Sequence, residues 1–212
     1  MTTASNLLAF LGLVSSLLIV WRQSWPARLR LFTAQSLLLA ALAATVGLLA
    51  QRRGLLLVAA VVVVKALAIP RVLARIGSGA PVRPIAPGRS SGIRLLVAGA
   101  LVVAAYVIML PVTSAVELPT ESAIPLAFAM ALIGLALCVT GRDALGHILG
   151  FLVFENGVFG LAILATYGLP GIVEAGVFLD VLVIVLIMEA VVVQVRREHD
   201  SIDVEHLREL RG

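Results

Sequence analysis

Four ionisable side chains lie within long apolar runs of this sequence, where water would not reach them if the runs cross a membrane. They are Lys65, Glu155, Asp180 and Glu189. A charged side chain at the centre of a bilayer costs about 2.5–3.5 kcal/mol on insertion scales, so such residues mark candidate functional sites. Carboxyl and amine groups bind and release protons, and proton transfer is therefore the chemistry that these residues could perform.

Lys65 is the only lysine of the chain and lies near the middle of the apolar run Leu55–Ala74. Pro70 follows it closely and cannot donate to the carbonyl of Ala66, so the sequence predicts a helix kink near Lys65. A buried lysine of this kind either takes up and releases a proton or forms a static ion pair that holds helices together. The sequence is compatible with both roles.

Glu155 lies near the centre of the run Gly146–Thr166 and is followed by Asn156. Its carboxyl group either carries protons or stays protonated and bonded to a neighbouring helix. His147 precedes it in the same run, about 12 Å away along a helix axis and about 80° around it. His147 is therefore predicted to be an inner-side relay acting through water, or a simple interfacial histidine. Gln35 and Asn156 are the predicted polar support of the proton path.

Asp180 and Glu189 share the last apolar run, Ile172–Val195. On a helix they would be about 13 Å and about half a turn apart, so they cannot share one face. We expect Asp180 to be the second proton carrier and Glu189 to belong to the proton path as well. If Asp180 lies near Glu155 or its neighbours, Glu189 faces elsewhere, toward a partner subunit. Glu174, near the outer end of this run, is predicted to be a solvated charge.

The composition is that of a membrane protein. Of the 212 residues, 61% are hydrophobic and 13% are charged, against about 45–50% and about 25% in soluble domains. These values exclude a soluble enzyme and a disordered chain, and the single Cys138 excludes an intrachain disulfide. One Cys and three His are too few to ligate an iron–sulfur cluster, and no soluble segment could hold a nucleotide or a flavin. We therefore expect no cofactor, no metal site and no enzymatic activity of the chain alone.

Seven apolar runs are long enough to cross a bilayer core, which takes roughly 20 helical residues. They lack the alternation of polar and apolar residues that strands of an outer-membrane barrel show, and they therefore predict helices. The expected fold is an all-α polytopic transmembrane bundle of about seven helices, or of six because two runs are short. The runs are Ala4–Trp21, Leu31–Ala50, Leu55–Ala74, Leu95–Val112, Ile124–Thr140, Gly146–Thr166 and Ile172–Val195.

The arginines are distributed unevenly between the two ends of these runs. With seven crossings, 13 of them fall on one side and two, Arg52 and Arg53, on the other. The positive-inside rule then places the N-terminus outside and the C-terminus in the cytoplasm. We predict a multi-pass protein of the cytoplasmic (inner) membrane, surrounded by lipid. Arginines spread over several short loops in this way determine topology and do not indicate nucleic-acid binding.

The sequence divides into four predicted segments. Residues 1–76 form an N-terminal three-helix membrane part, and residues 77–94 form a cytoplasmic loop rich in Pro, Gly and Arg. Residues 95–195 form a four-helix membrane part, and residues 196–212 form a charged cytoplasmic tail.

The last three runs and the tail resemble the small three-helix K-type subunit of respiratory complex I, and the whole length resembles component E of the hydrogenase-4 type complexes. The K-type resemblance lies in Glu155-Asn156, in an acid of the next helix, and in the ending Ile202-Asp203-Val204 and Arg208-Glu209-Leu210-Arg211-Gly212. The component E resemblance lies in Gln35-Ser36, Lys65 with Pro70, Glu155-Asn156-Gly157 and Leu179-Asp180-Val181-Leu182-Val183.

The resemblance implies a non-catalytic membrane subunit of a complex-I-like, NADH dehydrogenase-like nickel–iron hydrogenase or formate hydrogenlyase. Its partners would be antiporter-like and other membrane subunits, and it would contribute to a hydrated axis that conducts protons. Glu155 matches the first family acid, and either Asp180 or Glu174 matches the second. Two alternatives stay open. The chain could be a structural anchor whose buried charges only fix helix pairing, or the small subunit of a multi-subunit sodium/proton antiporter.

Overall fold

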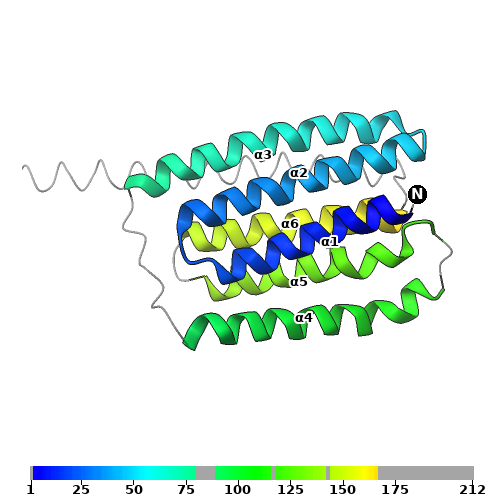
Figure 1. The fold of residues 1–212 in the computed structure, drawn as a ribbon. Helices are drawn as coiled ribbons and strands as arrows, with labels where there is room; N and C mark the ends of the chain where they lie inside the picture. Colours follow the sequence, from blue (N-terminus) through cyan, green and yellow to red (C-terminus); the bar gives the residue numbers. More distant parts are fainter. Residues whose placement is uncertain (1, 80–88, 116–117, 142–143, 167–212) are drawn as a thin grey trace, which may run out of the picture. The chain divides into compact units, whose positions relative to one another are not determined.

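The computed structural model describes residues 2–79, 89–115, 118–141 and 144–166, and these residues form helices joined by short turns. Each of the six α-helices is long and apolar enough to cross a membrane, and the all-α prediction is confirmed for the described residues. The helices are α1 (Thr2–Trp21), α2 (Trp25–Leu49), α3 (Arg53–Gly79), α4 (Arg89–Thr113), α5 (Ile124–Thr140) and α6 (Ala144–Thr166), with a short 3-10 helix, η1 (Glu121–Ala123), before α5 (Figure 1).

Some predictions fall on residues outside this description. The seventh run, Ile172–Val195, lies there together with Asp180, Glu189 and Glu174. The helix count of seven, the orientation of the termini and the division into four segments therefore stay predictions.

Within the described unit the helices run side by side (Figure 1). Helix α5 packs along α6, and α2 packs between α1 and α3 and also reaches α6. Helix α1 contacts α5 and α4, and α4 packs on α5. Helices α1, α2, α5 and α6 thus make the core, while α3 attaches chiefly to α2.

Several helices extend beyond the apolar runs that predicted them. Helix α2 begins at Trp25 rather than Leu31, and Pro26 fits its first turn because a proline there needs no amide partner. Helices α3 and α4 extend to Gly79 and from Arg89, into the predicted loop 77–94. The added turns contain arginines, which lie at the level of lipid headgroups when a helix is longer than the hydrocarbon core.

Three glycines allow α5 and α6 to approach at backbone distance. A Cβ atom at Gly134 of α5 would overlap the backbone of Phe154 on α6. Cβ atoms at Gly150 and Gly157 of α6 would overlap the backbone of Cys138 and of Ala131 on α5. Small residues at helix contacts are typical of membrane proteins, where close packing replaces the hydrophobic effect as the force between helices.

The turn from α2 to α3 is a Schellman motif without its usual glycine. The amide of Arg52 donates to the carbonyl of Gly47 at 2.8 Å, and the amide of Gln51 donates to that of Leu48 at 3.4 Å. Gln51 has φ of 54°, in the left-handed region. A β-branched residue is strained there, while glycine is not.

We therefore expect Gln51→Val to be less stable than Gln51→Gly by about 1–2 kcal/mol. Unfolding of the two variants in mixed micelles, titrated with dodecyl sulfate and followed by circular dichroism, measures the difference. Equal midpoints would show that this turn does not depend on its left-handed residue.

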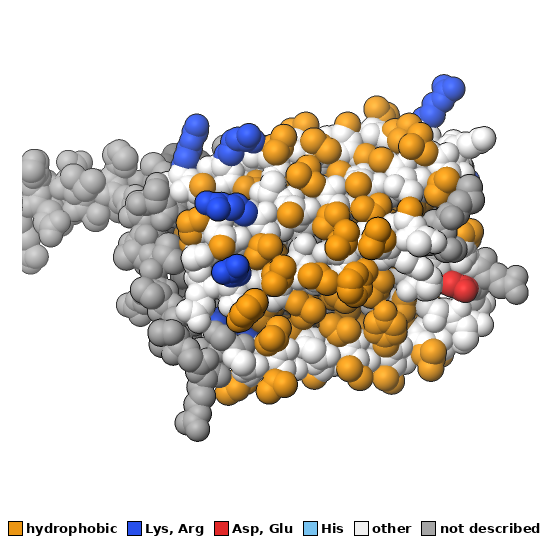
Figure 2. All heavy atoms as spheres, in the orientation of Figure 1, with side chains coloured by type: hydrophobic (Ala, Val, Ile, Leu, Met, Phe, Trp, Pro, Cys, Tyr) orange, Lys and Arg blue, Asp and Glu red, His pale blue; other side chains and the backbone are white. Residues whose placement is uncertain are grey.

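The face of the bundle drawn in Figure 2 is apolar along its length and has most of its basic side chains at one end. Helix α4 is the most exposed, with 11% of its most apolar window buried, against 39% or more in each of the other described helices. Such a surface suits lipid or an apolar partner, because it would be unstable in water.

Candidate functional site

Lys65 and Glu155 form an ion pair in the middle of the membrane-spanning part. The Lys65 Nζ atom lies 2.7 Å from Glu155 Oε2, and the two side chains are 2% and 1% exposed. Lys65 comes from the central turns of α3 and Glu155 from those of α6. Two of the four ionisable residues that the sequence singled out are therefore direct partners.

The ion pair spans helices that share little other contact. Helix α3 packs mainly on α2, whereas α6 packs on α5 and α2. The long lysine side chain reaches from α3 to α6. Val62 and Ala66, its neighbours on α3, are also buried.

A second polar contact lies directly beside the ion pair. Asn156, the residue after Glu155, donates from Nδ2 to the Ser36 hydroxyl at 2.9 Å. Asn156 and Ser36 are both buried, and this bond joins α6 to α2. Asn156, predicted as polar support of the proton path, therefore makes a contact between two helices next to Glu155.

Gln35 continues this arrangement from α2 to α1. Its Nε2 atom donates to the Ser16 hydroxyl at 2.6 Å, and Ser16 donates onward to the Gly12 carbonyl at 3.2 Å. The same Nε2 atom lies 3.9 Å from the Met130 sulfur of α5. We call these three contacts together the polar layer. It consists of Lys65, Glu155, Asn156, Ser36, Gln35 and Ser16.

The polar layer runs across the helices rather than along one of them. Adjacent residues on α6 (155 and 156) and on α2 (35 and 36) link the separate contacts into one sequence from α3 to α1. Within the part of the chain that the structure describes, the side-chain oxygens of Gln35 and Asn156 are buried without a hydrogen-bond partner. The accepting capacity of both oxygens is therefore unused.

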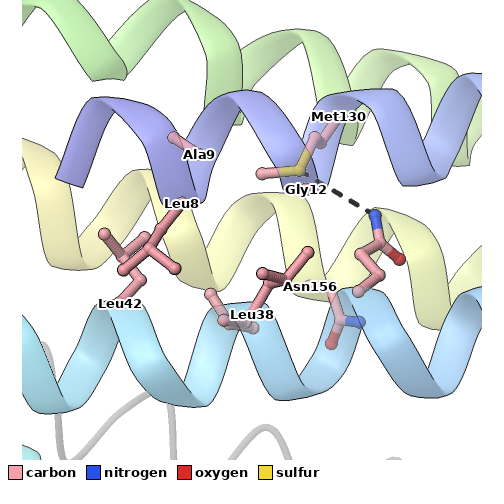
Figure 3. Close-up of a pocket in the computed structure, with 9 residues that line it drawn as sticks. Leu8, Ala9, Gly12, Leu38, Leu42, Met130 and Asn156 are labelled. Carbon is pink, nitrogen blue, oxygen red and sulfur yellow. Dashed lines mark hydrogen bonds between the residues drawn. The ribbon is translucent and has the colours of Figure 1, made fainter. Parts of the chain in front are cut away.

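A small cavity adjoins Gln35 and Asn156 (Figure 3). Its volume is about 10 Å³, close to that of a single water. Its walls come from four helices: Leu8, Ala9 and Gly12 of α1, Gln35, Leu38, Leu39 and Leu42 of α2, Met130 of α5, and Asn156 of α6. A cavity of this size cannot hold a substrate or an organic cofactor.

The other predicted site residues are not part of the polar layer as described. His147 is exposed in the first turn of α6, close to Gly141, and about 12 Å along the axis from Glu155. Asp180 and Glu189 lie outside the described residues. Among the side chains that are described, no group of three or more His, Cys, Asp or Glu is placed to hold a metal ion.

Sequence reasoning missed Ser16 and Met130, which contact Gln35. Serine and methionine are common in membrane helices, so neither residue type stands out by itself. A weak signal for Ser16 is present, because Ser15-Ser16 is the only polar pair within an otherwise apolar stretch from Leu7 to Trp21.

Comparison with known proteins gives relatives of nearly the same length. The uncharacterized protein Rv0085 of Mycobacterium tuberculosis is 38% identical over 204 residues, which are 94% of this chain and 93% of the relative. Hydrogenase-4 component E of Escherichia coli K12 is 26% identical over 209 residues, which are 98% of this chain and 97% of the relative. The chain belongs to the family of hydrogenase-4 component E and Rv0085. No family model matches it, and no solved structure gives a significant match.

Part of the resemblance to hydrogenase-4 component E lies in Gln35-Ser36, Lys65 and Glu155-Asn156, and the rest lies in Pro70, Gly157 and residues 179–183, the last of which are outside the described residues. The first five residues named are among the six that form the polar layer. Among the described residues, these polar members of the family resemblance are therefore the ones that make buried contacts between helices.

Proposed function

We propose that this protein is an integral membrane subunit of a hydrogenase-4 type complex and that its polar layer carries protons sideways through the bundle. The buried Lys65–Glu155 ion pair, with its 2.7 Å separation, is the observation that supports this function best. Homology to hydrogenase-4 component E supports membership of such a complex.

The physical basis is the balance of large opposing energies in a buried ion pair. Desolvation opposes both charges, and their attraction in a low dielectric favours them, so two large opposing energies act on the pair. In the proposed function, a change of electric field or hydration alters this balance and moves a proton between Lys65 and Glu155. A neighbouring subunit that changes its charge during turnover would supply such a change.

The amides of Asn156 and Gln35 donate to the hydroxyls of Ser36 and Ser16, so a proton would need water to pass between the three contacts of the layer. A hydroxyl group donates and accepts at once, and Ser36 and Ser16 both lie in the polar layer. The amide oxygens of Gln35 and Asn156 have accepting capacity left. Since the layer crosses the bundle from α3 to α1, it suits a lateral segment of a longer path whose other segments lie in partner subunits. Asp180, predicted as the second carrier, would extend the path within this chain.

Glu155→Gln is the direct test. In membrane vesicles that contain the whole complex, we expect this variant to lower redox-coupled proton movement at least about tenfold, because a proton carrier is replaced by an amide that cannot ionise. Acidification is followed with a pH-sensitive dye, and assembly is followed on a blue-native gel.

Glu121→Gln is the matched control, since Glu121 is the other described acid and lies in η1, away from the polar layer. The complex that carries Glu121→Gln should move protons at the wild-type rate. Unchanged pumping in assembled Glu155→Gln would remove Glu155 from the path.

A structural anchor is the second candidate function, favoured by the small contact of α3 with the rest of the bundle apart from α2. In that case the ion pair only ties α3 to α6. Both Glu155→Gln and Lys65→Met would then lower the yield of complex, while every assembled complex would pump at the normal rate.

A further inference from the structure

The turn between α1 and α2 combines tryptophan and arginine more densely than any other described part of the chain. Helix α1 ends at Trp21 and α2 begins at Trp25. We call this segment the basic turn. It comprises Trp21, Arg22, Trp25, Arg28 and Arg30.

The ring of Trp21 lies at the surface and is paired with a cation. Trp21 is 55% exposed, and the guanidinium carbon of Arg22 lies 5.8 Å from the centroid of its ring. Trp25 is buried at 8% exposure and fixes the turn to the bundle. An exposed indole beside a guanidinium suits the boundary of a bilayer, where the ring meets glycerol and acyl groups and the cation meets phosphate.

The charge at this end of the bundle is positive over several helices. Arg71 and Arg75 lie toward the end of α3, and Arg94 lies near the start of α4, at the same end as the basic turn. Basic side chains gather at one end of the face drawn in Figure 2. Of the described residues only Glu121 and Glu155 are acidic, and neither is at this end. A negatively charged group that binds here is therefore not repelled by any described carboxylate.

The first turn of α2 adds amide donors to this positive charge, apart from Pro26, which has no N–H. Its N-cap is Ser24, whose side chain makes no capping hydrogen bond. The free amides at a helix N-terminus carry partial positive charge and bind phosphate groups. The positive-inside rule and the interfacial preference of tryptophan account for these residue types on this side, but neither rule requires the pairing of Trp21 with Arg22 beside a helix start.

We propose that the basic turn binds the headgroup of an anionic phospholipid. The phosphate would be held by Arg22, Arg30 and the start of α2, with the glycerol and acyl groups against Trp21. This inference is independent of the proton path, because none of these residues belongs to the polar layer.

The test is lipid retention by the full-length protein. The protein is equilibrated in micelles with equimolar phosphatidylglycerol and phosphatidylcholine, and the lipids that stay bound are identified by native mass spectrometry. We expect the wild type to retain phosphatidylglycerol in preference. The double variant Arg22→Gln/Arg30→Gln should lose this preference by about fivefold for each arginine removed.

Arg52→Gln/Arg53→Gln is the matched control, because it removes the same charge at the opposite end of the bundle. It should keep the preference for phosphatidylglycerol. Equal losses in the two double variants, or a wild type that retains both lipids equally, would overturn the proposal.

A second measurement needs no variant. Phosphatidylglycerol should raise the unfolding temperature of the wild type more than phosphatidylcholine does, and salt should weaken the difference by screening. Inorganic phosphate at the same concentration should not reproduce the rise. If it does, the turn binds a soluble anion and the lipid proposal is wrong.

Discussion

Replacing Lys65 by methionine is expected to destabilise the bundle by about 3–5 kcal/mol, the usual cost of leaving one member of a buried ion pair without its partner. Glu155→Gln should cost a similar amount, because Lys65 is then left without its counter-ion. The effect is large because both side chains are almost completely buried, at 2% and 1% exposure. Unfolding in mixed micelles, titrated with dodecyl sulfate and followed by circular dichroism, measures these changes.

The double variant Lys65→Met/Glu155→Gln distinguishes a paired contact from two independent ones. Since it removes both charges together, we expect it to be more stable than either single variant. Thr45→Ala is the control for the loss of a polar contact that does not join two helices, because the Thr45 hydroxyl donates to the Ala41 carbonyl of its own helix. If the two single losses add up in the double variant, the 2.7 Å contact between Lys65 and Glu155 does not contribute to stability as a pair.

Adding one methyl group at Gly150 should separate α5 from α6. The new Cβ atom would overlap the backbone of Cys138, which cannot move aside as a flexible side chain could. We expect Gly150→Ala to lower stability by about 1–3 kcal/mol, as overpacking does in well-packed interiors. The same change would shift α6, and with it Glu155 and Asn156, away from their partners.

Gly99→Ala is the matched control on α4. A Cβ atom at Gly99 meets nothing within 4 Å, so the extra methyl group has open space. This variant should be as stable as the wild type or more stable by up to about 1 kcal/mol, since alanine favours helices over glycine. Equal effects of the two substitutions would contradict the close backbone contact between α5 and α6.

The sequence predicted the helical elements well because bilayer thickness sets both their length and their composition. Six apolar runs correspond to the six described helices. Helix ends were predicted less well: Arg28 and Arg30 lie inside α2, although they mark the end of the apolar part of that segment. Hydropathy measures what can face hydrocarbon, whereas hydrogen bonding continues a helix into the headgroup layer.

The candidate residues could be predicted, but their partners could not. Lys65, Glu155, Gln35 and Asn156 were identified because polar groups in apolar runs are costly. That Lys65 meets Glu155 depends on how α3 lies across α2 toward α6, which no local pattern encodes. The contact between α5 and α6 shows the same limit, because no spacing within one helix indicates that Gly150 and Gly157 meet the backbone of α5 and that Gly134 meets that of α6.

Infrared difference spectroscopy of the assembled complex tests most directly whether Glu155 changes its protonation during turnover. We predict a carboxyl C=O band that appears or disappears on turnover of the wild type, is absent from Glu155→Gln, and is shifted in Lys65→Met. Identical difference spectra of the wild type and Glu155→Gln would mean that the Lys65–Glu155 pair is a fixed structural contact, and that protons cross the membrane elsewhere.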